Sequence, residues 1–417
     1  MALVSASIIT IGDELLIGQV IDTNSAWIAQ QLLDLGIEII RRTAIGDDKN
    51  AIMDTLSKDL QAVQLVILTG GLGPTSDDIT KPALCEYFNS KLVVNKKVES
   101  HLRSLFERRN IPLFPANLSQ AEVPENCLVL FNRQGTAPGM LFEKNNSIII
   151  SLPGVPHEMK GIMEDEVIPM LRKRFSSDAF MYRTIMTAGF GETAIAEKIK
   201  DIEEKLPSHI RLAYLPAYRM VRLRLTGSGA DKNILNEELK KLQEAIANRL
   251  NEMVVSLEDL PLEQIIISKL TKENQTIALA ESCTGGYIGH RITQIHGASK
   301  CFLGSIVCYQ YSAKELLLGV DATVLKNQGA VCEEVAKQMA IGVRKSLKSH
   351  IGFGITGLLS AGGDDDKTPV GTVWMAVCDE SAVRTIKYNF PYDRIQNKEV
   401  AANMALLFIW KYINHFL

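Results

Sequence analysis

Apolar and polar positions alternate along the first 175 residues in the rhythm of strands separated by helices. Short apolar runs at residues 5–11, 65–68 and 148–150 have the length and composition of buried strands, and amphipathic stretches such as residues 23–35 lie between them. Strands that alternate with helices are typical of a mostly parallel sheet with helices on both faces. We therefore predict a three-layer α/β domain over residues 1–175.

The rhythm changes after residue 181. The expected strands and helices then follow at residues 182–188 (strand), 192–205 (helix), 209–214 (strand), 219–226 (strand), 231–250 (helix) and 252–257 (strand). This β-α-β-β-α-β order is typical of the ferredoxin-like fold. Because no reactive side chains cluster here, we interpret residues 176–258 as a small ferredoxin-like α+β domain that connects its neighbours.

A third unit begins near Pro261 and again mixes strands with helices. We expect strands at residues 276–281, 303–310, 351–356, 370–378 and 382–389, helices at 262–272, 286–295, 312–319, 331–347 and 395–413, and a polar loop at 361–368. The pattern predicts a second α/β domain over residues 259–417.

Composition narrows the class of protein. The 417 residues have a formal net charge of −3, whereas nucleic-acid-binding domains usually show a basic excess, so we do not expect direct nucleic-acid binding. No apolar run reaches the roughly 18 residues of a membrane span, and the first residues lack a signal-peptide pattern, so we expect a cytoplasmic protein without membrane partners. Seven cysteines without a C-x-x-C pair predict reduced thiols, and scattered histidines argue against zinc.

Ser282 marks the first candidate site. It lies where the apolar strand 276–281 gives way to a helix through Thr284, Gly285 and Gly286. This position puts its hydroxyl at the carboxyl end of the sheet, where open α/β sheets bind ligands. The N–H groups at the start of the helix are expected to be free to hold an anion or a tetrahedral oxyanion.

A serine nucleophile needs a base, and Lys314 is the candidate because it follows the next expected strand. Lysine acts as a base only when neutral, so its pKa has to fall from about 10.4 toward 7–8. Burial or a second cation such as Arg394 would lower it. The alternative is that Ser282 and Thr284 cap the helix while Lys314 is a surface residue.

Three runs carry a resemblance to a known family: residues 280–286 (Ala-Glu-Ser-Cys-Thr-Gly-Gly), 329–331 (Gly-Ala-Val) and 369–373 (Pro-Val-Gly-Thr-Val). They resemble the C-terminal domain of the CinA family (competence/damage-inducible protein A). In that family the domain is an amidase that converts nicotinamide mononucleotide to nicotinate mononucleotide and ammonia without a cofactor. The resemblance implies catalytic roles for Ser282, Lys314 and Tyr309. It implies substrate-binding roles for Glu281, Cys283, Thr284, Gly285, Gly286, Thr356, Gly357 and Arg394, the last as a phosphate ligand.

One loop departs from the family pattern. Where the family has Thr-Gly-Ile-Ala-Gly-Pro, residues 356–361 read Thr-Gly-Leu-Leu-Ser-Ala. The loss of Gly-Pro at Ser360 and Ala361 is expected to reshape the nucleotide pocket.

A second candidate site follows the apolar strand 65–68. Gly70, Gly71 and Gly73 suit a close approach of phosphate to backbone N–H groups. The neighbouring Asp77 and Asp78 would repel a phosphate, which points to a divalent cation between them. The alternative is that these are acidic loops and helix caps without chemistry.

This half of the chain also resembles the CinA family. The runs 10–18 (Thr-Ile-Gly-Asp-Glu-Leu-Leu-Ile-Gly) and 22–24 (Asp-Thr-Asn), with the glycine-rich run, are similar to its N-terminal domain, which has the molybdopterin-binding fold of the MoaB, MogA and MoeA proteins. The resemblance implies an ADP-ribose pyrophosphatase that depends on Mg, Mn or Co. It assigns substrate binding to Gly70, Gly71 and Gly73, and metal binding to Asp47, Asp77 and Asp78.

Taken together, these features predict a bifunctional enzyme of pyridine-nucleotide recycling that acts on small nucleotides and forms a homodimer. Two alternatives stay open: a non-catalytic regulatory protein of competence or the DNA-damage response, and a molybdopterin-binding protein.

Overall fold

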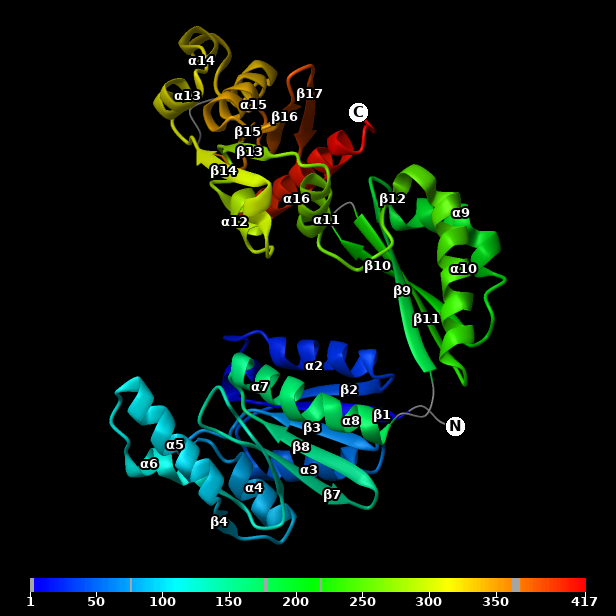
Figure 1. The fold of residues 1–417 in the computed structure, drawn as a ribbon, viewed down its shortest axis with the longest axis vertical. Coiled ribbons are helices and arrows are strands. Elements are labelled where there is room, and N and C mark those ends of the chain that lie inside the picture. The colour runs from blue at the N-terminus through cyan, green and yellow to red at the C-terminus, as the bar shows by residue number, and fades with distance from the viewer. Residues whose placement is uncertain (1–3, 76, 176–178, 218–219, 362–367) are drawn as a thin grey trace. The chain divides into compact units, whose positions relative to one another are not determined.

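The computed structural model describes residues 4–75, 77–175, 179–217, 220–361 and 368–417. These residues form three separate β-sheets of four to six strands, each with its own helices, and a two-stranded ribbon (Figure 1). Each sheet is described by itself below. Among the described residues, no helix is both long and apolar enough to cross a lipid bilayer. All seven cysteines are free thiols, as expected.

The first sheet has the strand order β2-β1-β3-β8-β7-β6. Its strands are β1 (Ser5–Ile11), β2 (Glu38–Ile45), β3 (Leu65–Thr69), β6 (Leu128–Leu130), β7 (Gly139–Lys144) and β8 (Ser147–Leu152). The strands β2, β1, β3 and β8 pair in parallel, and β7 and β6 add an antiparallel edge. The ribbon consists of β4 (Leu92–Val94) and β5 (Glu122–Pro124).

Helices cover both faces of this sheet. They are α1 (Asp13–Leu16), α2 (Thr23–Asp34), α3 (Lys49–Asp59), α4 (Thr80–Tyr87), α5 (Lys96–Arg109), α6 (Pro115–Leu118), α7 (Pro156–Ile162) and α8 (Ile168–Arg174). Successive side chains of a strand point to opposite faces, so Ile8 packs with Ile28 of α2 while Ile9 packs with Ile52 of α3. The predicted three-layer α/β architecture is confirmed.

The second sheet has the order β10-β11-β9-β12. Its elements are β9 (Ala179–Ala188), α9 (Glu192–Glu203), β10 (Ile210–Ala217), β11 (Met220–Gly229), α10 (Lys232–Leu250) and β12 (Val254–Ser256). The last strand lies beside the first and runs antiparallel to it, as the ferredoxin-like expectation requires.

The third sheet has the order β14-β13-β15-β16-β17. Its strands are β13 (Ile277–Glu281), β14 (Phe302–Val307), β15 (Ile351–Gly357), β16 (Thr372–Cys378) and β17 (Val383–Asn389). The first three pair in parallel, whereas β16 and β17 are antiparallel. The helices are α11 (Leu262–Lys272), α12 (Tyr287–Thr293), α13 (Tyr311–Leu318), α14 (Ala322–Gln328), α15 (Glu333–Leu347) and α16 (Arg394–Ile413).

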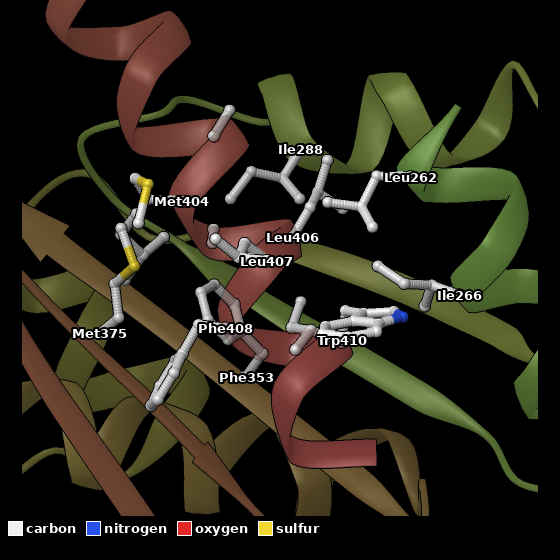
Figure 2. Close-up of a cluster of buried hydrophobic side chains, with 14 of the residues drawn as sticks. Leu262, Ile266, Ile288, Phe353, Met375, Met404, Leu406, Leu407, Phe408 and Trp410 are labelled. Carbon is white, nitrogen blue, oxygen red and sulfur yellow. The ribbon is translucent and has the colours of Figure 1, made fainter. Parts of the chain in front are cut away.

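The core of this domain is built around α16, the longest helix here. Figure 2 shows Leu406 and Trp410 of α16 with Leu262 and Ile266 of α11 and Phe353 of β15 in one buried cluster. The opposite face of the sheet packs against α13, α14 and α15 through a second apolar cluster.

One helix of this domain was not predicted, and one predicted loop lies largely outside the described residues. Helix α14 was not predicted, because its seven residues follow Gly319 too closely to show a helical period. The polar loop predicted at residues 361–368 lies outside the described residues for positions 362–367.

Candidate active sites

A cleft opens at the carboxyl ends of the parallel strands in the third sheet. Ser282 follows β13, Tyr309 comes two residues after β14, and Thr356 is the second-to-last residue of β15. The cleft has a volume of about 200 Å³ and is lined by Ser282, Cys283, Tyr309, Tyr311, Lys314, Ala330, Val331, Thr356, Gly357, Leu358, Leu359, Ser360, Ala361 and Arg394. Seven of the predicted site residues therefore share one cavity, while Glu281, Thr284, Gly285 and Gly286 lie outside its lining.

Lys314 lies in the first turn of α13 and is 0% exposed. Its Nζ is 3.0 Å from Ser282 Oγ, 2.8 Å from the carbonyl oxygen of Cys308 and 3.1 Å from that of Tyr309. Burial lowers the pKa of Lys314 below its ordinary value of 10.5. Of the two causes that the sequence left open, burial is therefore the one at work, and Arg394 does not contribute. The alternative of a surface lysine is wrong.

The three contacts of Lys314 suit either protonation state, and burial, which lowers the pKa of Lys314, favours the neutral amine. A protonated lysine has three donors and no acceptor, whereas the neutral amine has two donors and one lone pair. In the neutral form the two N–H groups donate to the carbonyl oxygens of Cys308 and Tyr309, which leaves the lone pair facing Ser282 Oγ. This is the hydrogen-bond reach that a nucleophile and its base require.

Glu281 does not face the cleft. It is 0% exposed, and its carboxylate accepts hydrogen bonds from the N–H groups of Ile288 and Gly289 at 3.1 and 2.8 Å and from the hydroxyls of Thr284 and Ser305 at 2.8 Å each. The expectation that the first N–H groups of α12 are free for an anion is therefore wrong, because Glu281 occupies that helix end. Glu281 fastens the loop that carries Ser282 to the helix behind it.

Other backbone N–H groups around Ser282 also donate hydrogen bonds within the protein. The Ser282 N–H donates to the carbonyl of Ile355 at 3.1 Å, and the Gly285 N–H donates to the carbonyl of Ser282 at 3.1 Å. Gly285 and Gly286 both have positive φ values, 61° and 89°, so this tight turn depends on glycine. The Gly285 N–H is therefore not free to hold an oxyanion, contrary to the expectation for this turn.

Cys283 lines the cleft beside the serine, but its chemistry is different. Burial raises the pKa of the Cys283 thiol to about 12. Since the thiolate is the reactive form of cysteine, Cys283 stays an unreactive thiol at neutral pH. Ser282 is the hydroxyl in contact with a base.

The predicted Arg394 shapes one end of the cleft together with Asn397, which was not predicted from the sequence. Arg394 donates to the hydroxyls of Ser360 and Tyr309, each at 2.9 Å. The buried Asn397 donates to the carbonyls of Leu359 and Tyr392 at 2.9 and 2.7 Å, which ties the loop before Ser360 to the start of α16. An asparagine inside an apolar helix is the sequence signal that could have identified it.

A second cleft, of about 370 Å³, lies at the carboxyl ends of the parallel strands in the first sheet. It is lined by Ile11, Gly12, Glu14, Asp47, Gly70, Gly71, Leu72, Gly73, Pro74, Asp77, Asp78, Gln120, Thr136, Ala137, Pro153, Gly154, Val155 and Glu158. All six residues that the sequence assigned to this site line one cavity. Gln120 and Glu158, which come from distant parts of the chain, were not predicted.

Asp78 shapes the glycine loop of this cleft. Its carboxylate accepts hydrogen bonds from the N–H groups of Gly73 and Thr75 at 2.7 and 2.9 Å, and from the Thr75 hydroxyl. Gly70 has a φ of 117°, and a Cβ there would lie 2.1 Å from the carbonyl oxygen of Ile11, so no other residue fits.

The acidic residues are crowded, but they do not form a complete metal centre. Burial and the neighbouring charges of Asp13, Glu14 and Asp77 raise the pKa of Asp47, against hydrogen bonding from the Asp13 N–H at 3.0 Å. Within the described part of the chain, no group of three or more His, Cys, Asp or Glu side chains is arranged to hold a metal ion. Asp78 is committed to the glycine loop, so Asp47, Asp77 and Asp78 do not converge as joint ligands. Magnesium is commonly held by one or two carboxylates with phosphate oxygens, and Asp47 and Asp77 fit that pattern.

Comparison with known families matches each part of the chain. The models described as a probable molybdopterin binding domain, a damage-inducible protein CinA KH domain and a CinA C-terminal domain match residues 7–173, 182–255 and 259–413. A CinA-like protein of Cytophaga hutchinsonii is 45% identical over 402 residues, which cover 96% of each chain. The chain belongs to the CinA family.

Other members of the CinA family extend this similarity. A CinA-like protein of Flavobacterium psychrophilum is 43% identical and covers 98% of both chains. A putative competence-damage inducible protein of Halothermothrix orenii is 37% identical, again over 98% of both chains. The fold is that of the family: a molybdopterin-binding-like domain, a KH-like linker and a C-terminal CinA domain.

Proposed function

We propose that the C-terminal domain is an amidohydrolase that converts nicotinamide mononucleotide to nicotinate mononucleotide and ammonia. The observation that carries this proposal is the 3.0 Å contact between Ser282 Oγ and Nζ of the buried Lys314, whose pKa burial lowers. The membership of the CinA family supports the substrate class.

The proposed reaction begins with Lys314 taking the proton of Ser282 as Oγ bonds to the carboxamide carbon. The tetrahedral intermediate collapses when its C–N bond breaks, and Lys314 returns the proton to the departing nitrogen, which leaves as ammonia. The resulting ester on Ser282 is then attacked by water. Lys314 takes a proton from that water and passes it to Ser282 Oγ as the bond to the serine breaks. The product forms as a carboxylic acid, which releases its proton to bulk water and leaves as the carboxylate, and the resting pair is restored.

The test is ammonia release by the full chain supplied with nicotinamide mononucleotide. Wild-type protein is expected to release one ammonia for each nicotinate mononucleotide formed. In the variant Ser282→Ala the rate of ammonia release should fall at least a thousandfold, in line with removal of a catalytic nucleophile. Full activity of Ser282→Ala would reject the covalent route and favour direct attack by an activated water. No release by the wild-type chain would reject the amidase proposal.

For the N-terminal domain we infer a metal-dependent hydrolysis of ADP-ribose to AMP and ribose 5-phosphate. The crowded carboxylates around Asp47 support a cation, because a divalent ion relieves their mutual repulsion. The glycine loop at Gly70 and Gly71 supports a phosphate, because backbone can approach it closely. A bound Mg, Mn or Co ion would neutralise negative charge on the phosphates. Asp47 would help to hold the ion, and the glycine loop would orient the phosphates.

This second activity is tested by AMP formation from ADP-ribose with and without added Mn²⁺. Asp47→Asn is expected to abolish the metal-dependent rate while leaving ammonia release by the C-terminal domain unchanged. Metal-independent AMP formation would refute the role of the cation.

The match to a probable molybdopterin binding domain supports a competing function for the same cleft. Titration with molybdopterin separates the two: tight binding without AMP formation would replace our proposal. A chain that forms neither ammonia nor AMP would favour a regulatory role in competence or the DNA-damage response. The predicted homodimer is tested by light scattering on the purified chain.

A further inference from the structure

Arg394 is the first residue of α16, and two hydroxyl groups hold its guanidinium in the cleft. Nη1 donates to Ser360 Oγ and Nη2 to the hydroxyl of Tyr309, each at 2.9 Å. All three residues line the cavity that contains Ser282 and Lys314. The guanidinium therefore belongs to the same cleft as the catalytic pair.

The charge of Arg394 is not compensated within the described residues. None of the ion pairs that they form involves Arg394. The adjacent Asp393 accepts the Gln396 N–H at 2.9 Å as the cap of α16. A guanidinium has five N–H donors, and the described residues accept hydrogen bonds from two of them, so an anion can be bound by the others.

The support of this group is rigid. Asn397 is 0% exposed and binds the carbonyls of Leu359 and Tyr392, which fixes the residue before Ser360 against the first turn of α16. On the other side, the carbonyl of Tyr309 accepts a hydrogen bond from Lys314 while its hydroxyl accepts one from Arg394. Tyr309 thereby links the guanidinium to the catalytic lysine.

We propose that Ser360 is a specificity-determining residue that selects substrates carrying a phosphate monoester. A hydroxyl that accepts a hydrogen bond keeps its own proton, so Ser360 donates that proton to the phosphate while orienting Arg394. The proposal rests on the amidase function proposed above. Ser360 stands where the resemblance described above predicts glycine, which has no hydroxyl to offer.

The test compares Ser360→Gly with Ser360→Thr on two substrates, nicotinamide mononucleotide and its neutral counterpart nicotinamide riboside. Ser360→Gly is expected to raise KM for the nucleotide about 10-fold to 100-fold, the usual effect of losing a hydrogen bond to a charged group, with kcat within threefold of wild type. The riboside, which has no phosphate, should show unchanged kcat/KM. Ser360→Thr, which keeps the hydroxyl, should restore KM for the nucleotide.

Equal losses on both substrates would overturn the proposal, since a collapsed loop has no preference for phosphate. An unchanged KM for the nucleotide, or no rescue by threonine, would overturn it as well. Calorimetric titration of nicotinamide mononucleotide into Ser282→Ala and into Ser282→Ala/Ser360→Gly separates this proposal from the amidase function. A weaker affinity in the double variant supports the phosphate contact even if the wild-type chain releases no ammonia.

Discussion

Replacing Lys314 with methionine tests the central claim about the C-terminal site. Methionine has a similar length and no amine, so Lys314→Met removes the base while filling the same buried space. The matched control is Lys326→Met in α14, because that lysine is exposed in the same domain.

The structure sets the size of the expected effect. A positioned general base contributes about 10²–10⁴ in rate, so Lys314→Met is expected to lower kcat for ammonia release by that factor. At about 1.36 kcal/mol for each tenfold change, this is about 3–5 kcal/mol of transition-state stabilisation. The variant also leaves the carbonyls of Cys308 and Tyr309 without their partner, at about 1–3 kcal/mol each, but it relieves the cost of burying an amine. Because these two effects oppose each other, we expect the loss of stability to be smaller than the sum for the two unpaired carbonyls.

The pH dependence gives an independent readout. Because burial lowers the folded pKa of Lys314 below 10.5, kcat/KM of the wild-type chain should rise with pH and level off below that value. The free energy of unfolding should also rise with pH. Between the folded and the unfolded pKa, the unfolded chain holds a proton that the folded chain does not, so stability rises with pH by up to about 1.4 kcal/mol per unit. This slope should be missing in Lys314→Met.

Ammonia release by both variants at pH 6–10, with urea denaturation at the same pH values, measures both effects. A Lys314→Met variant with more than a tenth of the wild-type kcat would refute the role of Lys314 as base. A wild-type profile that shows no levelling by pH 10 would refute the lowered pKa of Lys314.

Three further predictions concern other parts of the two sites. Glu281→Ala leaves the buried N–H groups of Ile288 and Gly289 without an acceptor, and should lower the free energy of unfolding of the C-terminal domain by about 2–6 kcal/mol in urea; a loss under 1 kcal/mol would contradict its structural role. Asp78→Ala should reduce AMP formation from ADP-ribose more than tenfold without changing ammonia release, because the glycine loop loses its acceptor; equal losses in both assays would indicate global unfolding. Cys283→Ala should keep kcat for ammonia release within threefold at pH 7–8, because burial raises the pKa of that thiol to about 12; a hundredfold loss would show a direct role.

Local sequence was enough to place the reactive residues at the ends of strands. An apolar run followed by Ser282 and glycines predicts a strand and a tight turn, and the parallel pairing of β13 and β14 then brings Lys314 toward the serine, as observed. Hydrophobic periodicity likewise predicted the three sheets, because a side chain's burial repeats with the period of its element. The short α14 escaped this reasoning, since seven residues hold barely two turns.

Local sequence was not enough to say what each polar side chain binds. Glu281 and Asp78 looked like substrate and metal ligands, yet one caps α12 and the other holds the glycine loop. Such partners depend on which backbone donors lie within hydrogen-bond distance after folding.

What the sequence determined by itself is the order of the elements, the two positions where chemistry gathers, and the membership of a family that these motifs carry. Only the tertiary structure decided the burial and pKa of Lys314 and the hydrogen-bond partners of Arg394. Burial lowers the lysine's pKa because surrounding apolar atoms replace water, and those atoms come from elements far apart in the chain. Ser360 and Tyr309 meet Arg394 across 34 and 85 residues of sequence, so only the folded sheet and helix bring them together.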